Sequence, residues 1–106
     1  MQIQEVNFEK LRASAELATS LLKVMANSDR LMLLCQLSQG EKSVSELEEI
    51  LAIKQPTLSQ QLTVLRNANL VSTRREGKSI YYMISSTSAL AIMNVLYQEI
   101  CMKSGD

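Results

Sequence analysis

The stretch from Lys54 to Arg66, KQPTLSQQLTVLR, constrains the fold most, because its outward face is polar without being charged. Leu58, Leu62 and Leu65 recur at helical spacing and predict one apolar stripe. The opposite face and its flanks carry hydroxyls and amides, namely Thr57, Ser59, Gln60, Gln61 and Thr63. Such groups both donate and accept hydrogen bonds, as the reading of base edges in a major groove requires. The stretch therefore predicts a DNA recognition helix, and a polar surface helix without a partner is the alternative.

Charge is balanced over the whole chain but not along it. The 11 basic and 11 acidic residues cancel, so no net charge draws the protein to nucleic acid. From residue 54 to 78, however, a single acid, Glu76, accompanies a group of cations. These are Lys54, Arg66, Arg74, Arg75 and Lys78. A local positive patch is therefore available despite the neutral total.

Length and cysteine content bound the class of protein. The 106 residues fit one domain, expected to span 1–106. Two cysteines and an N-terminus without a secretion signal predict a cytoplasmic protein, in whose reducing surroundings paired thiols are more often reactive or metal-binding than structural. The longest apolar runs, such as Leu31 to Cys35, are too short to cross a bilayer, so no membrane partner is expected.

Two helices are expected to open the chain. Apolar residues at three-and-four spacing predict the first from about Val6 to Met25. Leu17 and Leu21 widen its apolar stripe and leave surplus surface for a partner. The second helix carries Leu31 to Leu37 and ends at Gly40.

A helix-turn-helix is predicted to follow. The capping-box signature Ser43-Val44-Ser45-Glu46 opens a short helix that reaches about Leu51. Ala52 to Lys54 is then the turn into the polar-faced helix, near whose start Pro56 is tolerated because the first turn does not need that N–H.

After the polar-faced helix the pattern changes to that of strands. Leu70 to Glu76 and Ser79 to Ile84 are rich in β-branched and aromatic residues, and the Gly77-Lys78 pair between them predicts a hairpin. A hairpin with cations at its tip beside a helix-turn-helix is a wing that can contact phosphates. From Ser86 the chain is helical again almost to its end. The expected fold class is mainly α with a small β-hairpin, a winged helix-turn-helix.

The order of elements and the residues themselves resemble the ArsR family of winged-helix repressors. The match is continuous through RLMLLCQL, SVSELEEILAIKQPTLSQQLTVLRNANLV and TRREGKSIYYMIS, and it covers about Ala15 to Met102. This resemblance implies a homodimer formed by the first and last helices, with the polar-faced helix in the major groove and the hairpin beside it. It also implies release of DNA when an inducer binds.

The residues at the metal sites of that family are absent from this chain. Many ArsR proteins sense metals through a Cys-x-Cys pair where this chain has Ser43-Val44-Ser45, and others use His and Asp from the last helix. This chain has no histidine, and carboxylates alone make a poor site for zinc or softer metals. No metal or other cofactor is expected.

Cys35 and Cys101 indicate a different inducer. Cys35 within LMLLC, the following QPTLSQQL and Cys101 after Tyr97 resemble the BigR and HlyU branch of the family, whose regulators respond to persulfides or oxidants. The resemblance implies that the two cysteines face each other within one subunit and are bridged by reactive sulfur species in a di-, tri- or tetrasulfide. The alternative is that Cys35 is a small buried hydrophobe and Cys101 an exposed bystander.

The expected function is that of a repressor that releases operator DNA when the cysteines are bridged. Two alternatives stay open: an activator like HlyU that displaces a nucleoid protein, and a protein-interaction module that does not bind DNA. An enzyme is not expected, since Cys35 has only Leu, Met and Gln as close sequence neighbours. The residues expected at base edges and nearby phosphates are Gln55, Thr57, Ser59, Gln60 and Thr63. Those expected on the DNA backbone are Arg66, Arg74, Arg75 and Lys78.

Overall fold

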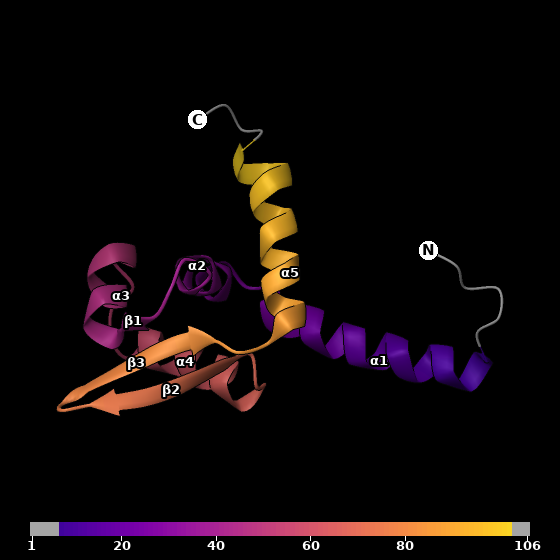
Figure 1. Ribbon diagram of the computed structural model, residues 1–106, viewed down its shortest axis with the longest axis horizontal. Coiled ribbons are helices and arrows are strands. Elements are labelled where there is room, and N and C mark those ends of the chain that lie inside the picture. Colours follow the sequence, from indigo (N-terminus) through magenta and orange to yellow (C-terminus); the bar gives the residue numbers. More distant parts are fainter. Residues whose placement is uncertain (1–6, 103–106) are drawn as a thin grey trace.

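The computed structural model describes residues 7–102 and consists of helices packed around a small antiparallel sheet (Figure 1). The elements in chain order are α1 (Phe8–Met25), α2 (Ser28–Leu37), β1 (Lys42–Ser43), α3 (Val44–Leu51), α4 (Thr57–Asn67), β2 (Val71–Glu76), β3 (Ser79–Ile84), α5 (Thr87–Leu96) and the π-helical turn η1 (Tyr97–Cys101). The expected winged helix-turn-helix is confirmed. Val6, the expected start of the first helix, lies outside the described residues.

Polar side chains cap the helices where the sequence predicts. The side chain of Asn27 accepts from the N–H of Arg30 at 3.0 Å at the start of α2. At α3 the predicted capping box is present, because Ser43 Oγ accepts from the N–H of Glu46 at 3.1 Å and the Glu46 carboxylate accepts from the N–H of Ser43 at 2.8 Å. These bonds from Ser43 hold the pKa of Glu46 below its ordinary value, so their stabilising effect is lost as the pH falls through that lowered pKa.

The polar-faced helix starts later than the sequence stretch suggests. Ala52 ends α3 in the left-handed conformation, with φ 58°, and buried Ile53 anchors the connection that follows. Proline disfavours helical backbone in the residue before it, so Gln55 remains outside the helix and α4 begins at Thr57. The turn therefore extends to Pro56 instead of ending at Lys54.

The core lies where α2, α3, α4 and α5 meet. Leu58, Leu62 and Leu65, the predicted apolar stripe, are 0%, 1% and 0% exposed. Burial of a leucine side chain contributes about 1.5–3 kcal/mol, so this stripe fixes the rotation of α4 about its own axis. The other side chains of the buried cluster include Met25, Leu33, Leu34, Leu37, Leu47, Ala89 and Met93.

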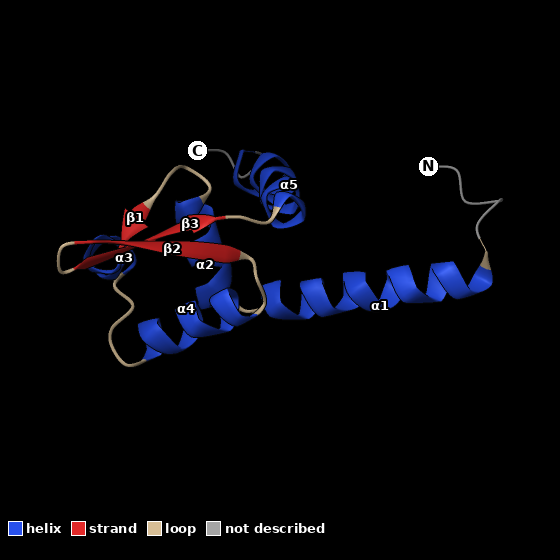
Figure 2. Ribbon diagram, turned by 60° about the horizontal axis from the view of Figure 1, so that its bottom comes forward, coloured by secondary structure: helices blue, strands red, loops and turns tan. Residues whose placement is uncertain are grey.

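The sheet has the order β1-β3-β2. The predicted hairpin is present, with Val71 opposite Ile84, Glu76 opposite Ser79 and Gly77 in the turn at φ 63°. The short strand β1, which was not predicted, pairs with the middle of β3 and leads directly into α3. The base of the wing is thereby tied to the start of the helix-turn-helix, and α4 runs below the hairpin in Figure 2.

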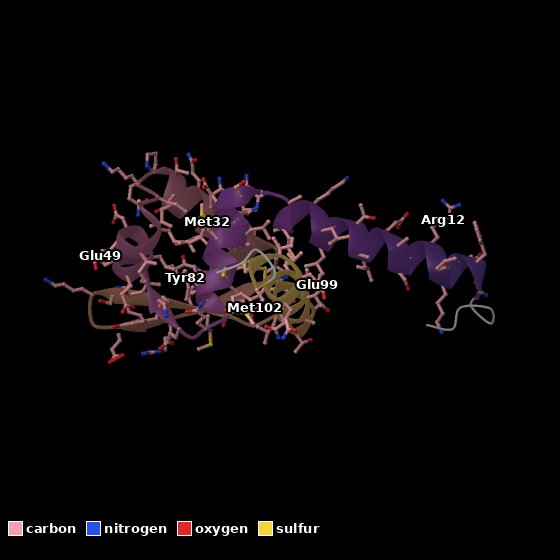
Figure 3. All side chains as sticks on the ribbon, turned by 90° about the horizontal axis from the view of Figure 1, so that it is seen from above. Arg12, Met32, Glu49, Tyr82, Glu99 and Met102 are labelled. Carbon is pink, nitrogen blue, oxygen red and sulfur yellow. The ribbon has the colours of Figure 1, made fainter. Side chains whose placement is uncertain are left out.

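Two helices leave apolar side chains uncovered. α1 projects from the body, and Arg12 lies far along it in Figure 3. Of the two residues predicted to leave surplus apolar surface, Leu17 is 75% exposed, whereas Leu21 is half-buried and packs against the core; Phe8 is also 68% exposed. The last helix is not regular to its end, since the α-helix changes after Leu96 into the π-helical turn η1.

None of the helices in residues 7–102 is long and apolar enough to span a bilayer.

Ser43→Ala is expected to lower the free energy of unfolding by about 1 kcal/mol, because it removes the acceptor for an otherwise unpaired N–H at the start of α3. Urea denaturation followed by circular dichroism measures this loss. Ser45→Ala is the matched control, since Ser45 is exposed in the same helical turn. Equal effects of the two substitutions would contradict a stabilising role for the capping box.

Candidate nucleic-acid interface and thiol pocket

The outward face of α4 is polar and exposed, as predicted. Thr57, Gln60 and Thr63 are all exposed there, opposite the buried leucine stripe. Arg66 is exposed in the last turn of the same helix. This face therefore presents hydroxyl and amide groups to solvent on a rigid helix, with a cation at its C-terminal end.

Gln55 and Ser59, two of the predicted contact residues, bind each other. The side-chain oxygen of Gln55 accepts from the N–H of Ser59 at 3.1 Å and from its hydroxyl at 2.6 Å. Pro56 at the N-cap provides no side-chain cap, so Gln55 satisfies the first turn of α4 in its place. The amide NH₂ of Gln55 takes no part in this cap and is a donor-only group.

Sequence reasoning missed Arg30, which joins the end of α1 to α4. Its Nε donates to the carbonyl oxygen of Val24 at 2.5 Å, and its Nη1 donates to Oε1 of Gln61 at 2.7 Å. Gln61 is thus half-buried and bonded to α2. Arg30 and Gln61 are 31 positions apart, so no local sequence pattern could have indicated this contact.

The wing cations do not share one environment. Arg74 donates to both carboxylate oxygens of Glu41, at 2.6 and 2.7 Å, and to Glu76 at 2.7 Å. Its guanidinium also lies 4.6 Å from the centre of the Tyr81 ring. The bond from Arg74 holds the pKa of Glu41 below its ordinary value, so this ion pair is lost only as the pH falls through the lowered pKa.

Arg75 and Lys78 stand apart from that cluster. Both are exposed, and within residues 7–102 neither forms an ion pair. Lys78 also lines an open cavity of about 400 Å³ between the wing, the start of α3 and α4. Ser59 and Thr63 line the same cavity from α4. The structure therefore brings the polar face of the helix and one wing cation to a common depression.

A second cavity, called here the thiol pocket, lies between α2 and the end of the chain. Cys35 of α2 and Cys101 of η1 are free cysteines, the first half-buried and the second exposed, and both line this space of about 290 Å³. The other lining residues are Leu31, Met32, Met93, Leu96, Tyr97 and Ile100. Two thiols distant in sequence thus share one apolar cavity within one chain. Among the described residues, no three His, Cys, Asp or Glu side chains cluster as metal ligands.

Known proteins share both the sequence and the arrangement of elements. Residues 27–73 match the family model described as bacterial regulatory protein, arsR family. The Biofilm growth-associated repressor of Agrobacterium fabrum is 46% identical over 101 residues, which cover 95% of this chain and 86% of that protein. The chain belongs to the ArsR family.

Solved ArsR structures agree with the fold described above. The transcriptional repressor BigR from Xylella fastidiosa is similar at a TM-score of 0.83 and 44% identity, covering 91% of this chain and 98% of that one. The transcriptional activator HlyU of Vibrio cholerae is 40% identical over 96 residues, 91% of this chain and 89% of that protein. A structure of reduced HlyU has a TM-score of 0.85 and 39% identity, covering 89% and 99%.

Membership in the ArsR family makes the chain a DNA-binding transcriptional regulator. The sequence-based expectations of this family, and of a protein that is not an enzyme, are thereby confirmed.

Arg30→Met is expected to lower both the free energy of unfolding and operator affinity, because α4 loses its tie to α1 and α2. A double-mutant cycle with Gln61→Leu isolates the side-chain pair, with an expected coupling of about 0.5–3 kcal/mol. Urea denaturation and fluorescence anisotropy on operator DNA provide the two readouts. Arg12→Met, on the projecting part of α1, is the control, and strictly additive effects of the two variants would refute the coupling.

Proposed function

We propose that this ArsR chain is a single-domain, homodimeric repressor that releases its operator when Cys35 and Cys101 are joined by a sulfur bridge. The observation that carries the proposal is that both free cysteines line one apolar cavity between α2 and the end of the chain. α2 also packs against the recognition helix α4. A bond formed in the thiol pocket would therefore act directly on the scaffold of the DNA-binding surface.

DNA recognition is assigned to α4 and the tip of the wing. Thr57, Gln60 and Thr63 would contact base edges, with Gln55 and Ser59 at the start of the helix close to bases and phosphates. This assignment is supported by the exposure of these side chains and by the bond that holds Gln61 to α2. The residues assigned to phosphates are Arg66, Arg75 and Lys78.

We assign Arg74 a structural role in the wing and not the phosphate contact that its sequence position predicts. Two carboxylates already compensate its charge, and Tyr81 covers one side of its guanidinium. A phosphate would have to displace Glu41 or Glu76 to reach it at full strength. We therefore infer that Arg74 braces the wing against the loop before β1, while Arg75 and Lys78 contact the DNA backbone.

A homodimer is supported by the uncovered apolar surface on both ends of the chain. On α1, Phe8 and Leu17 are largely exposed, and on α5 Leu90 and Val95 are 37% and 59% exposed. Several large exposed apolar side chains on the same helices favour an interaction surface. A symmetric pair would present two copies of α4 to half-sites about 34–36 Å apart, one turn of the DNA helix.

The bridging chemistry needs no metal. A thiolate of the protein attacks the outer sulfur of an organic persulfide, R–S–SH, forming protein S–SH and releasing R–S⁻, which takes up the thiol proton. The second cysteine then attacks the sulfur bound to the first, giving a disulfide and H₂S. If both cysteines are loaded first, closure gives a trisulfide and H₂S, and one further sulfur atom before closure gives a tetrasulfide.

The bridge would transmit its effect through α2. It ties α2, which carries Arg30 and supports α4, to the last helix, which we assign to the dimer interface. A change in the angle between these helices alters the distance between the two recognition helices of a dimer. Because the half-sites have a fixed spacing, a small change would lower the affinity for the operator.

An activator is the second candidate, because HlyU, a similar protein, is named a transcriptional activator. Such a protein would bind the same kind of site and raise transcription by displacing a nucleoid protein. Transcription in vitro from purified components separates the two. A repressor lowers transcription from naked DNA, whereas an anti-repressor affects it only when the nucleoid protein is present. The third alternative, a protein-interaction module that does not bind DNA, would not explain why the wing carries exposed cations.

Gln60→Ala is expected to reduce discrimination between operator and random DNA by about 1–3 kcal/mol, because a base-edge contact is lost. Arg75→Ala should instead weaken binding to all sequences and reduce the slope of log affinity against log salt by about one. Titrations by fluorescence anisotropy at several salt concentrations measure both effects. An equal loss on operator and random DNA in Gln60→Ala would show that its assignment is wrong.

Treatment with an organic persulfide is expected to add whole sulfur atoms between Cys35 and Cys101 and to lower operator affinity by about 5–150-fold, the usual range of allosteric coupling. Intact mass and operator affinity are measured on the same sample, with hydrogen peroxide in parallel. Cys35→Ser and Cys101→Ser should keep full affinity after treatment, since neither can close the bridge. A bridged protein that binds the operator as tightly as the reduced one would refute the switch.

A further inference from the structure

The composition of the thiol pocket restricts which sulfur donors can use it. Within residues 7–102, none of the residues lining it carries a formal charge, and apart from the two thiols the only polar group among these described side chains is the hydroxyl of Tyr97. We propose that the pocket selects uncharged, apolar persulfides, such as small alkyl or aryl hydropersulfides, over hydrophilic anionic donors such as glutathione persulfide. This inference rests on the proposed function and specifies the inducer class for the same site.

The two cysteines differ in exposure, and this difference indicates which of them discriminates between sulfur donors. Cys101 is exposed, at the last residue of η1, where donors of any charge can reach it from solvent. Cys35 is half-buried and packs against the hydrophobic core. A donor must therefore enter the apolar space to place its outer sulfur against Cys35. The selection acts on the loading of Cys35.

Size and charge both favour a small apolar group in that space. A volume of about 290 Å³ is at the lower end of ligand pockets and accommodates an alkyl or benzyl substituent. Methionine side chains are flexible and polarisable, so Met32 and Met93 can adapt to such a group and to its sulfur atoms. The carboxylates of glutathione persulfide would lose hydration there without gaining a charged partner among the lining residues that the structure describes, which is costly.

The chemical step is the same for both donors, so only access differs. The Cys35 thiolate attacks the outer sulfur of R–S–SH, the new S–S bond forms on the protein, and the S–S bond of the donor breaks. The leaving thiolate R–S⁻ accepts the proton that Cys35 lost. No further oxidant is consumed, because the donor sulfur is reduced as the protein sulfur is oxidised.

The test measures the loading of Cys35 alone, in the Cys101→Ser variant. Second-order rate constants are determined by mass spectrometry for benzyl hydropersulfide and for glutathione persulfide, each divided by that donor's rate constant with N-acetylcysteine. Iodoacetamide, a small neutral reagent, reports the intrinsic reactivity of Cys35. The expected result is a preference of at least about tenfold for the benzyl donor, from the cost of burying charge.

A charge introduced at the pocket should change this preference. Met32, which is labelled in Figure 3, belongs to α2. It lines the pocket and is 40% exposed. Met32→Lys is expected to bring the two normalised rate constants within about threefold, because the lysine stabilises the anionic donor and disfavours the apolar one. Met83→Lys is the matched control, because Met83 is 41% exposed on β3 and is not among the lining residues. It should leave the preference unchanged.

The outcomes separate this inference from the proposed function. Equal normalised rate constants for the two donors, or a preference that Met32→Lys does not alter, would overturn the selection for apolar donors. In that event the switch itself would stand, provided that bridged wild-type protein has lost affinity for the operator. If neither donor modifies Cys35, or if bridging leaves operator affinity unchanged, the proposed function fails and the inference fails with it.

Discussion

The burial of the leucine stripe of α4 is the constraint on which the proposed DNA-binding surface depends. With Leu58, Leu62 and Leu65 inaccessible to solvent, α4 has one rotational setting, and the hydroxyls and amides opposite them must face outward. α2 supplies much of the opposing surface through Leu33 and Leu34, both fully buried. The same helix turns Cys35 toward the last helix, so one element supports the reading surface on one side and carries a thiol on the other.

The sequence predicts well those parts of the structure that are determined by residues close together in the chain. The stripe of α4, the capping box at Ser43 and the turn at Gly77 each depend on residues a few positions apart. The sequence stretch places the start of α4 at Lys54, which is three residues too early. The leucine spacing does not mark where a helix begins, and only Pro56, which disfavours helical backbone in the residue before it, indicates the later start. β1 is too short to show a period, and the π-helical turn after Leu96 keeps a helical composition.

Local sequence patterns do not predict contacts between residues that are far apart in the chain. Arg30 bonds to an amide of α4, and Glu41 pairs with Arg74, because the fold brings these segments together and not because of any local spacing. The pairing of the two cysteines is implied by the family resemblance and stays a prediction; the structure shows that both line one cavity. What composition could not indicate was the apolar character of that cavity, since its lining comes from α2 and from α5 and η1, which are at least 50 positions later in the chain.

The compensation of Arg74 by Glu41 and Glu76 bears on how the protein behaves as a cell changes its internal ion content. Each cation that neutralises a DNA phosphate releases a condensed counterion and adds about 0.9 to the dependence of affinity on salt. A wing that keeps one of its cations within its own charge cluster releases fewer counterions and gains less nonspecific affinity. Binding by such a wing therefore depends less on salt concentration than binding by a wing whose cations are all unpaired.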